Sequence, residues 1–114
     1  MHEFSIVQSL LNLIEEQAKL NNAKQVSKVL VKIGKMSGVE PHLLEMAFNT
    51  FKEKTIAENA ELIIEIQDII AYCKNCNIEF VIQDYSFICP DCKSIDVDVI
   101  DGTEMLLKSL ELEM

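Results

Sequence analysis

The sequence predicts an α+β fold, in which two helices accompany a small mixed sheet and a compact four-cysteine module interrupts the chain. Apolar residues recur at helical spacing in two stretches and alternate with polar residues in several others. The four cysteines occur as two close pairs. With 114 residues, the chain has the length of one compact unit with a small appended module.

The first helix is predicted at residues 3–20. Its apolar face is formed by Phe4, Val7, Leu11, Ile14 and Ala18. Three further apolar residues lie partly off this face, so we expect burial on more than one side; they are Ile6, Leu13 and Leu20. Asn21 and Asn22 are a plausible end of the helix.

A strand at 25–33 follows, because valine and isoleucine alternate there with lysine and leucine. Two glycines mark a loop at 34–38, and a second helix begins at Pro41, with Glu40 as its cap. Residues 52–60 are mostly polar and form a connection. Alternation resumes at 61–67, which predicts a second strand whose inward side chains are Leu62, Ile64 and Ile66.

The cysteines form two C-x2-C pairs, Cys73 with Cys76 and Cys89 with Cys92. Two such pairs can supply four thiolates at the corners of a tetrahedron, the ligand set of structural zinc. Single C-x2-C pairs also serve redox chemistry, and disulfides or free thiols are the alternative reading. The start of the chain has no basic, apolar export signal, so we expect a cytoplasmic protein, in whose reducing compartment metal-bound thiolates are favoured.

Between the cysteine pairs, two short strands at 78–82 and 86–88 would make the hairpin of a zinc ribbon. About 20 residues cannot bury enough apolar surface to fold alone, so zinc must supply the missing stability. After the module, residues 103–113 are expected to form a strand that returns to the first sheet. The predicted division is therefore an α/β domain of residues 1–70 and 94–114 and a zinc-ribbon domain of residues 71–93.

The charge is strongly acidic, with 10 Lys and Arg against 19 Asp and Glu and a net charge of −9. Such a chain repels phosphate backbones, so we expect no nucleic-acid partner. No apolar run approaches the roughly 20 residues of a membrane span. Neither His2 nor His42 belongs to a recognisable nucleophile motif, and a four-thiolate site has no open position, so no enzymatic activity is expected.

The first three residues are a second candidate metal site. The Met1 amine, the His2 amide nitrogen and the His2 imidazole can chelate a metal in one plane, and Glu3 can add an outer ligand. Tetragonal nitrogen and oxygen sites suit Ni(II) or Cu(II). Any chain that begins Met-His offers the same atoms, so these residues alone do not establish a site.

The start Met1-His2-Glu3-Phe4-Ser5 resembles that of the HypA/HybF family of nickel metallochaperones, which mature [NiFe]-hydrogenases. The resemblance covers essentially the whole chain, including the C-x2-C-x12-C-x2-C module and the closing segment 102–111. It implies Ni(II) as transferable cargo on His2 and its neighbours, with Glu40 near that site, and Zn(II) on the four cysteines. It also implies a nickel-binding GTPase and a hydrogenase large-subunit precursor as partners, with urease accessory proteins for some members.

Two alternatives come from other classes of protein. The chain could be a zinc-ribbon adaptor without nickel transfer, or a rubredoxin-like iron protein, because similar cysteine pairs hold iron. The acidic charge opposes an adaptor that binds nucleic acid, and a minimal electron carrier has no use for the segment before Cys73. Exposed edge strands are compatible with a monomer or a homodimer.

Overall fold

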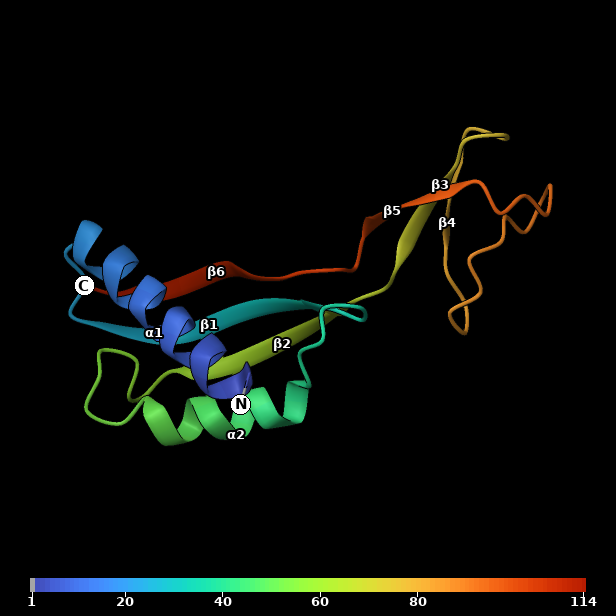
Figure 1. The fold of residues 1–114 in the computed structure, drawn as a ribbon. Coiled ribbons are helices and arrows are strands. Elements are labelled where there is room, and N and C mark those ends of the chain that lie inside the picture. Colours follow the sequence, from blue (N-terminus) through green and yellow to red (C-terminus); the bar gives the residue numbers. More distant parts are fainter. Residues whose placement is uncertain (1) are drawn as a thin grey trace.

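The computed structural model describes the backbone of residues 2–114 and the side chains of residues 4–114. It has two helices and two three-stranded sheets, arranged in an elongated molecule of 53 × 28 × 17 Å (Figure 1). The elements are α1 (His2–Leu20), β1 (Gln25–Gly34), α2 (Pro41–Phe51), β2 (Glu61–Gln67), β3 (Ile70–Cys73), β4 (Ile78–Val81), β5 (Val97–Asp101) and β6 (Met105–Glu113). The expected α+β class is confirmed. Within the described residues, no helix combines the length and apolar character that a membrane crossing requires.

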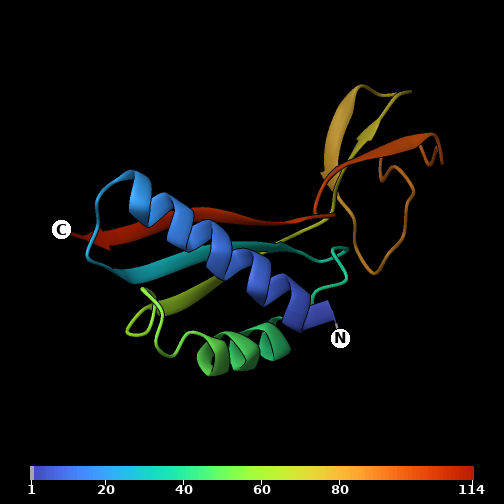
Figure 2. The ribbon, with the colours of Figure 1, turned by 60° about the vertical axis from the view of Figure 1, so that its left-hand side comes forward.

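The first sheet has the strand order β2-β1-β6 and is mixed. The central strand β1 pairs parallel with β2 and antiparallel with β6, so the last strand of the chain returns to the first, as predicted. Both helices cover one face of this sheet (Figures 1 and 2). Their apolar faces and the inward side chains of the sheet form the main core, which includes Val7, Ile14, Val29, Val31, Leu44 and Phe48.

The helix α1 buries mainly one face, on which Val7, Ile14 and Ala18 are fully buried. Of the three residues expected to extend this burial, Ile6 packs against the core, but Leu13 is 40% and Leu20 69% exposed, so the expectation was wrong for these two. On β2, Leu62 and Ile64 pack against the core as predicted. Ile66 does not, since it lies near the end of the strand and is 47% exposed.

The helix α2 begins where the sequence indicated. Glu40 has extended backbone angles and its Oε2 accepts a hydrogen bond from the Leu43 N–H at 2.7 Å, the usual geometry of an N-cap. Pro41 follows in the first turn, where its missing N–H costs nothing. At the other end of α2, the ring of Phe51 meets that of Phe4 edge to face, with centroids 5.1 Å apart, which fixes the start of α1 against α2.

The second sheet has the order β4-β3-β5 and extends from one end of the first (Figure 2). The predicted strand at 86–88 is absent, because Asp84 and Tyr85 both have positive φ and turn the chain away. Instead β4 pairs with β3, before the first cysteine turn. The sheet also includes β5, beyond residue 93, so it occupies more of the chain than 71–93. The division into an α/β domain of residues 1–70 and 94–114 and a zinc-ribbon domain of residues 71–93 stays a prediction.

The two sheets are joined where three backbone segments cross: the end of β1 at Gly34, the segment after β2 at Asp68, and the segment before β6 at Gly102. A Cβ on Gly34 would overlap backbone atoms of Gly102, and one on Gly102 would lie 2.6 Å from the Asp68 carbonyl oxygen. Hydrogen bonds close the crossing: Gly34 N–H donates to Glu104 O at 2.9 Å and Met36 N–H to Gly102 O at 2.8 Å. Both linkers to the second sheet are therefore held against the end of β1.

An ion pair lies on each linker. Lys35 Nζ is 2.6 Å from Asp68 Oδ1, and Lys32 Nζ is 3.3 Å from Asp101 Oδ2. The carboxylate of Asp68, by hydrogen bonding and by charge, raises the pKa of Lys35. Pairs this exposed add little stability, so the crossing depends mainly on backbone packing and backbone hydrogen bonds.

We predict that Gly34→Ala destabilises the protein by about 2 kcal/mol or more, because backbone rather than a flexible side chain must move. The control is Gly38→Ala. Gly38, unlike Gly34, has positive φ, at 80°, but open space around its Cβ position, so strain of about 1 kcal/mol is expected there. Denaturant unfolding of the metal-loaded protein measures both. Equal losses for the two variants would contradict the tight crossing.

Candidate metal centre

The two cysteine pairs lie on two turns of the same construction. In the first, Asn77 N–H donates to Cys73 O at 2.8 Å, and in the second Lys93 N–H donates to Cys89 O at 3.0 Å. Asn77 and Lys93 both have positive φ, of 59° and 63°. Each turn thereby reverses the chain directly after its second cysteine, which places both sulfurs of a pair on the same side.

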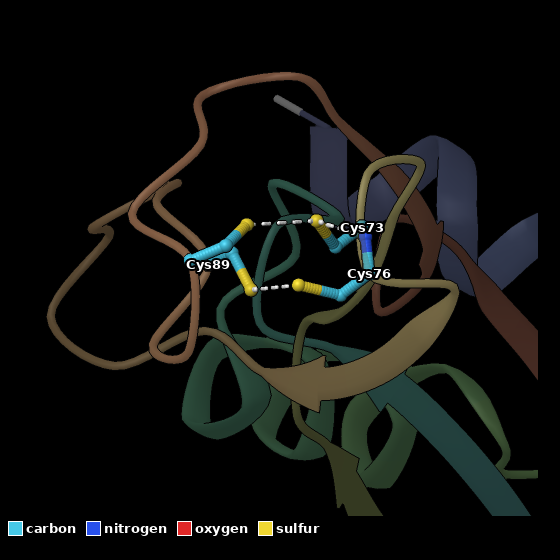
Figure 3. Close-up of side chains that lie close together, drawn as sticks. Cys73, Cys76 and Cys89 are labelled. Carbon is cyan, nitrogen blue, oxygen red and sulfur yellow. Dashed lines mark hydrogen bonds between the residues drawn. The ribbon is translucent and has the colours of Figure 1, made fainter.

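The turns bring the four sulfurs together (Figure 3). All four Sγ atoms of Cys73, Cys76, Cys89 and Cys92 lie within 4.8 Å of one another. Cys73 Sγ is 3.6 Å from Cys92 Sγ, and Cys89 Sγ is 3.9 Å from Cys76 Sγ. A tetrahedral ion with metal–sulfur bonds of about 2.3 Å requires sulfurs about 3.8 Å apart. The donor set and its spacing therefore fit a tetrahedral metal ion, as the sequence predicted.

The surroundings of the sulfurs lower the pKa of one thiol, Cys92, and raise the pKa of Cys73 and of Cys76. Cys76 N–H donates to Cys73 Sγ at 3.4 Å. The Asn75 side chain, together with neighbouring Cys76 and Ser94, lowers the pKa of Cys92 to about 6. The thiol of Cys92 is the main cause that raises the pKa of Cys76 to about 12. Cys92 therefore loses its proton more readily than Cys76, and metal binding requires that both thiols be deprotonated.

A charged contact supports the first turn from β5. Lys74 Nζ lies 3.7 Å from Asp96 Oδ1 and 3.6 Å from Asp98 Oδ1, and Lys74 N–H donates to Asp96 O at 3.2 Å. Sequence reasoning missed Lys74 and Asn75 as supporting residues. Their position inside a C-x2-C turn was a signal for such a role, but their partners on β5 and the second turn are distant in sequence.

The other predicted metal residues are at the start of the chain. Met1 lies outside the described residues, as do the side chains of His2 and Glu3, so the nickel prediction there is not tested. Ser5 and Ile6 are described. They line a surface furrow between α1 and β6, which Val39, the residue before Glu40, also lines. The start of α1 and the Glu40 loop are thus neighbours. His42 is exposed.

The model of one protein family matches residues 1–112, and its description reads hydrogenase/urease nickel incorporation, metallochaperone. The chain belongs to the HypA family. The match extends over both sheets and both cysteine turns, so family membership applies to the whole chain and not to the cysteine module alone.

Curated relatives and solved structures agree with this assignment. A hydrogenase maturation factor HypA from Aquifex aeolicus is 60% identical over 114 residues, covering 100% of this chain and 99% of its own. One from Wolinella succinogenes is 46% identical, covering 99% and 96%. The solution structure of the Ni metallochaperone HypA from Helicobacter pylori matches with a TM-score of 0.72 and 36% identity, covering 97% of each chain. A second HypA solution structure matches with a TM-score of 0.76 and 39% identity.

We predict that removing the metal with a chelator disorders the second sheet and leaves the first intact. The second core contains only three buried residues, Ile69, Ala71 and Ile82, whereas the first has its own extensive core. Amide exchange measured by NMR should show lost protection in β3, β4 and β5 only. Cys92→Ser should reproduce this effect, and the neighbouring exposed Asp91→Ser should not. Unchanged protection in β3 after complete metal removal would contradict the prediction.

Proposed function

We infer that this protein is a nickel metallochaperone that serves hydrogenase maturation. The observation that carries the inference is membership, over nearly the whole chain, of a family described as incorporating nickel. Neither alternative from the sequence accounts for it: a zinc-ribbon adaptor or a rubredoxin-like iron protein would share the cysteine module but not both sheets and both helices. We propose that the protein acts by binding and release and catalyses no reaction.

We assign Zn(II) to Cys73, Cys76, Cys89 and Cys92. The sulfur spacing suits bonds of about 2.3 Å, and four thiolates complete a tetrahedron without an open position. Such a site retains its ion, which makes it suitable for holding the second sheet together. It is poorly suited to cargo, because release would require thiolate ligands to leave and the small core around them to loosen.

We assign the transferable Ni(II) to His2, with the Met1 amine and Glu3 as further ligands. The terminal amine, the deprotonated amide and the imidazole form a planar nitrogen set, which Ni(II) accepts. Because all three groups must lose protons, binding weakens as the pH falls through the usual range of histidine. Glu40 is proposed as a nearby carboxylate. Val39, the residue before Glu40, lines the same furrow as Ser5. The capping hydrogen bond of Glu40 uses Oε2, so the carboxylate can still accept or coordinate through its other oxygen.

The proposed partners follow from the hydrogenase maturation role. They are a nickel-binding GTPase of the hydrogenase maturation system and the hydrogenase large-subunit precursor, with urease accessory proteins as further recipients. We place this exchange in the cytoplasm, with the protein as a monomer or homodimer. The net charge of −9 supports attraction of metal cations and of basic protein surfaces.

We predict that His2→Ala loses the nickel site, whereas His42→Ala, the only other histidine, binds nickel as the native chain does. Isothermal titration of zinc-loaded protein with Ni(II) should give one site for the native chain and for His42→Ala. A chain with two residues added before Met1 should lose the site too, because its terminal amine is displaced. Full binding by the extended chain would show that the amine is not a ligand. Full binding by His2→Ala would remove the assignment altogether.

A further inference from the structure

An apolar furrow runs between α1 and β6. One part has a volume of 590 Å³ and a lining that is mostly apolar, and a second part of 360 Å³ continues toward the end of β6. Leu13 and Leu107 line both parts, which makes the furrow continuous along most of the strand. Leu13 is 40% and Leu106 41% exposed, so apolar surface in this furrow faces solvent.

One wall of the furrow is an open strand edge. β6 is the outer strand of the sheet order β2-β1-β6, and within the described part of the chain no strand pairs with its far side. It forms the edge of the sheet opposite β2 in both ribbon views (Figures 1 and 2). β6 spans nine residues, and alternate peptide groups of an edge strand direct N–H and C=O outward. The edge therefore offers a row of hydrogen-bonding groups directly beside apolar surface.

The carboxylates near the furrow lie at the ends of β6 and not in the lining of the furrow. Lys108 is the one basic residue that lines it, and its Nζ is already bound by Glu65 at 2.8 Å. Exposed carboxylates lie at both ends of β6, on Glu104 before it and on Glu111 and Glu113 near its end. A second copy of this chain would bring the same negative charges and a net charge of −9 against them.

We propose that this furrow binds an extended, basic segment of another protein as an added strand on β6. A helix could fill the apolar furrow but would leave the outward N–H and C=O groups of β6 unpaired, whereas a strand satisfies both. In an added strand, alternate side chains point toward α1 and the others toward solvent. The segment should therefore carry apolar residues at every second position and lysine or arginine between them. This surface is separate from the four-cysteine site, and its end at Ser5 and Val39 adjoins the residues to which we assign nickel. The proposal does not require nickel transfer.

The test uses a short synthetic peptide of alternating lysine and valine, added to the zinc-loaded full chain. Amide exchange measured by NMR should slow for residues 105–110, and the peptide's own amides should gain protection. A peptide of the same composition with all lysines before all valines, and one with glutamate in place of lysine, should not protect β6. Equal protection by the block peptide would show that charge alone drives the contact and would overturn the proposal. Failure of the alternating peptide to protect β6 would overturn it too.

Two variants test whether the peptide binds in the furrow or elsewhere on α1. Leu13→Lys places a charge in the furrow and should weaken peptide binding by about tenfold or more, the effect of losing one buried leucine contact. Leu20→Lys makes the same change on the same helix, at a residue outside the furrow lining, and should bind like the native chain. Circular dichroism verifies folding, and Leu106→Lys repeats the test from the strand. Equal affinity of Leu13→Lys, Leu106→Lys and native protein overturns the proposal.

The protein without peptide tests whether a second copy of this chain occupies the furrow. Sedimentation at increasing concentration should show no dimer formed through β6, and the outward amides of 105–110 should exchange freely. If those amides are already protected and protection grows with concentration together with a dimer, the occupant is a second copy of this chain. That result overturns the proposal of a basic partner segment.

Discussion

The geometry of four cysteine sulfurs is the constraint on which the second half of the structure depends. Within the described residues, the apolar core of the sheet β4-β3-β5 has three buried members besides its cysteines, Ile69, Ala71 and Ile82, which is too little apolar surface to offset the entropy of ordering its loops. The two turns hold sulfurs at 3.6 and 3.9 Å, the spacing of a tetrahedral ion, so metal binding supplies what the core lacks. The first sheet has no such dependence, since α1, α2 and three strands bury a complete core between them.

The backbone crossing at Gly34 and Gly102 holds the two sheets against each other. Because no side chain intervenes, the loop after β1 hydrogen-bonds directly to both linkers, and that loop continues to Val39 and the Glu40 cap of α2. Val39 in turn shares a furrow with the first described side chains of α1. Backbone packing at the crossing and a shared furrow beside Val39 thus connect the metal-dependent sheet with the start of α1, where we place nickel. Movement of the second sheet would have to disturb this crossing first.

Local sequence patterns predicted both helices, the strands of the first sheet and the sulfur cluster. Helical spacing gave α1 and α2, alternation gave β1, β2 and β6, and the C-x2-C spacing gave the sulfur cluster. The predicted strand at 86–88 was wrong because β4 pairs with β3, which precedes the first cysteine turn, and not with the segment that follows β4. The pairing of β3 with β5 and the contact of Gly34 with Gly102 join residues far apart in sequence and leave no local signal. The nickel residues rest on family likeness and ligand chemistry.

We propose that the chain holds two metals in separate and chemically different sites. X-ray absorption at the nickel and zinc edges, on one sample loaded with both ions at neutral pH, tests this proposal most directly. We predict zinc surrounded by four sulfurs at about 2.3 Å, and nickel surrounded by nitrogen and oxygen with no sulfur. Sulfur in the nickel shell, or nitrogen and oxygen in place of sulfur around zinc, would contradict the separation of the two sites.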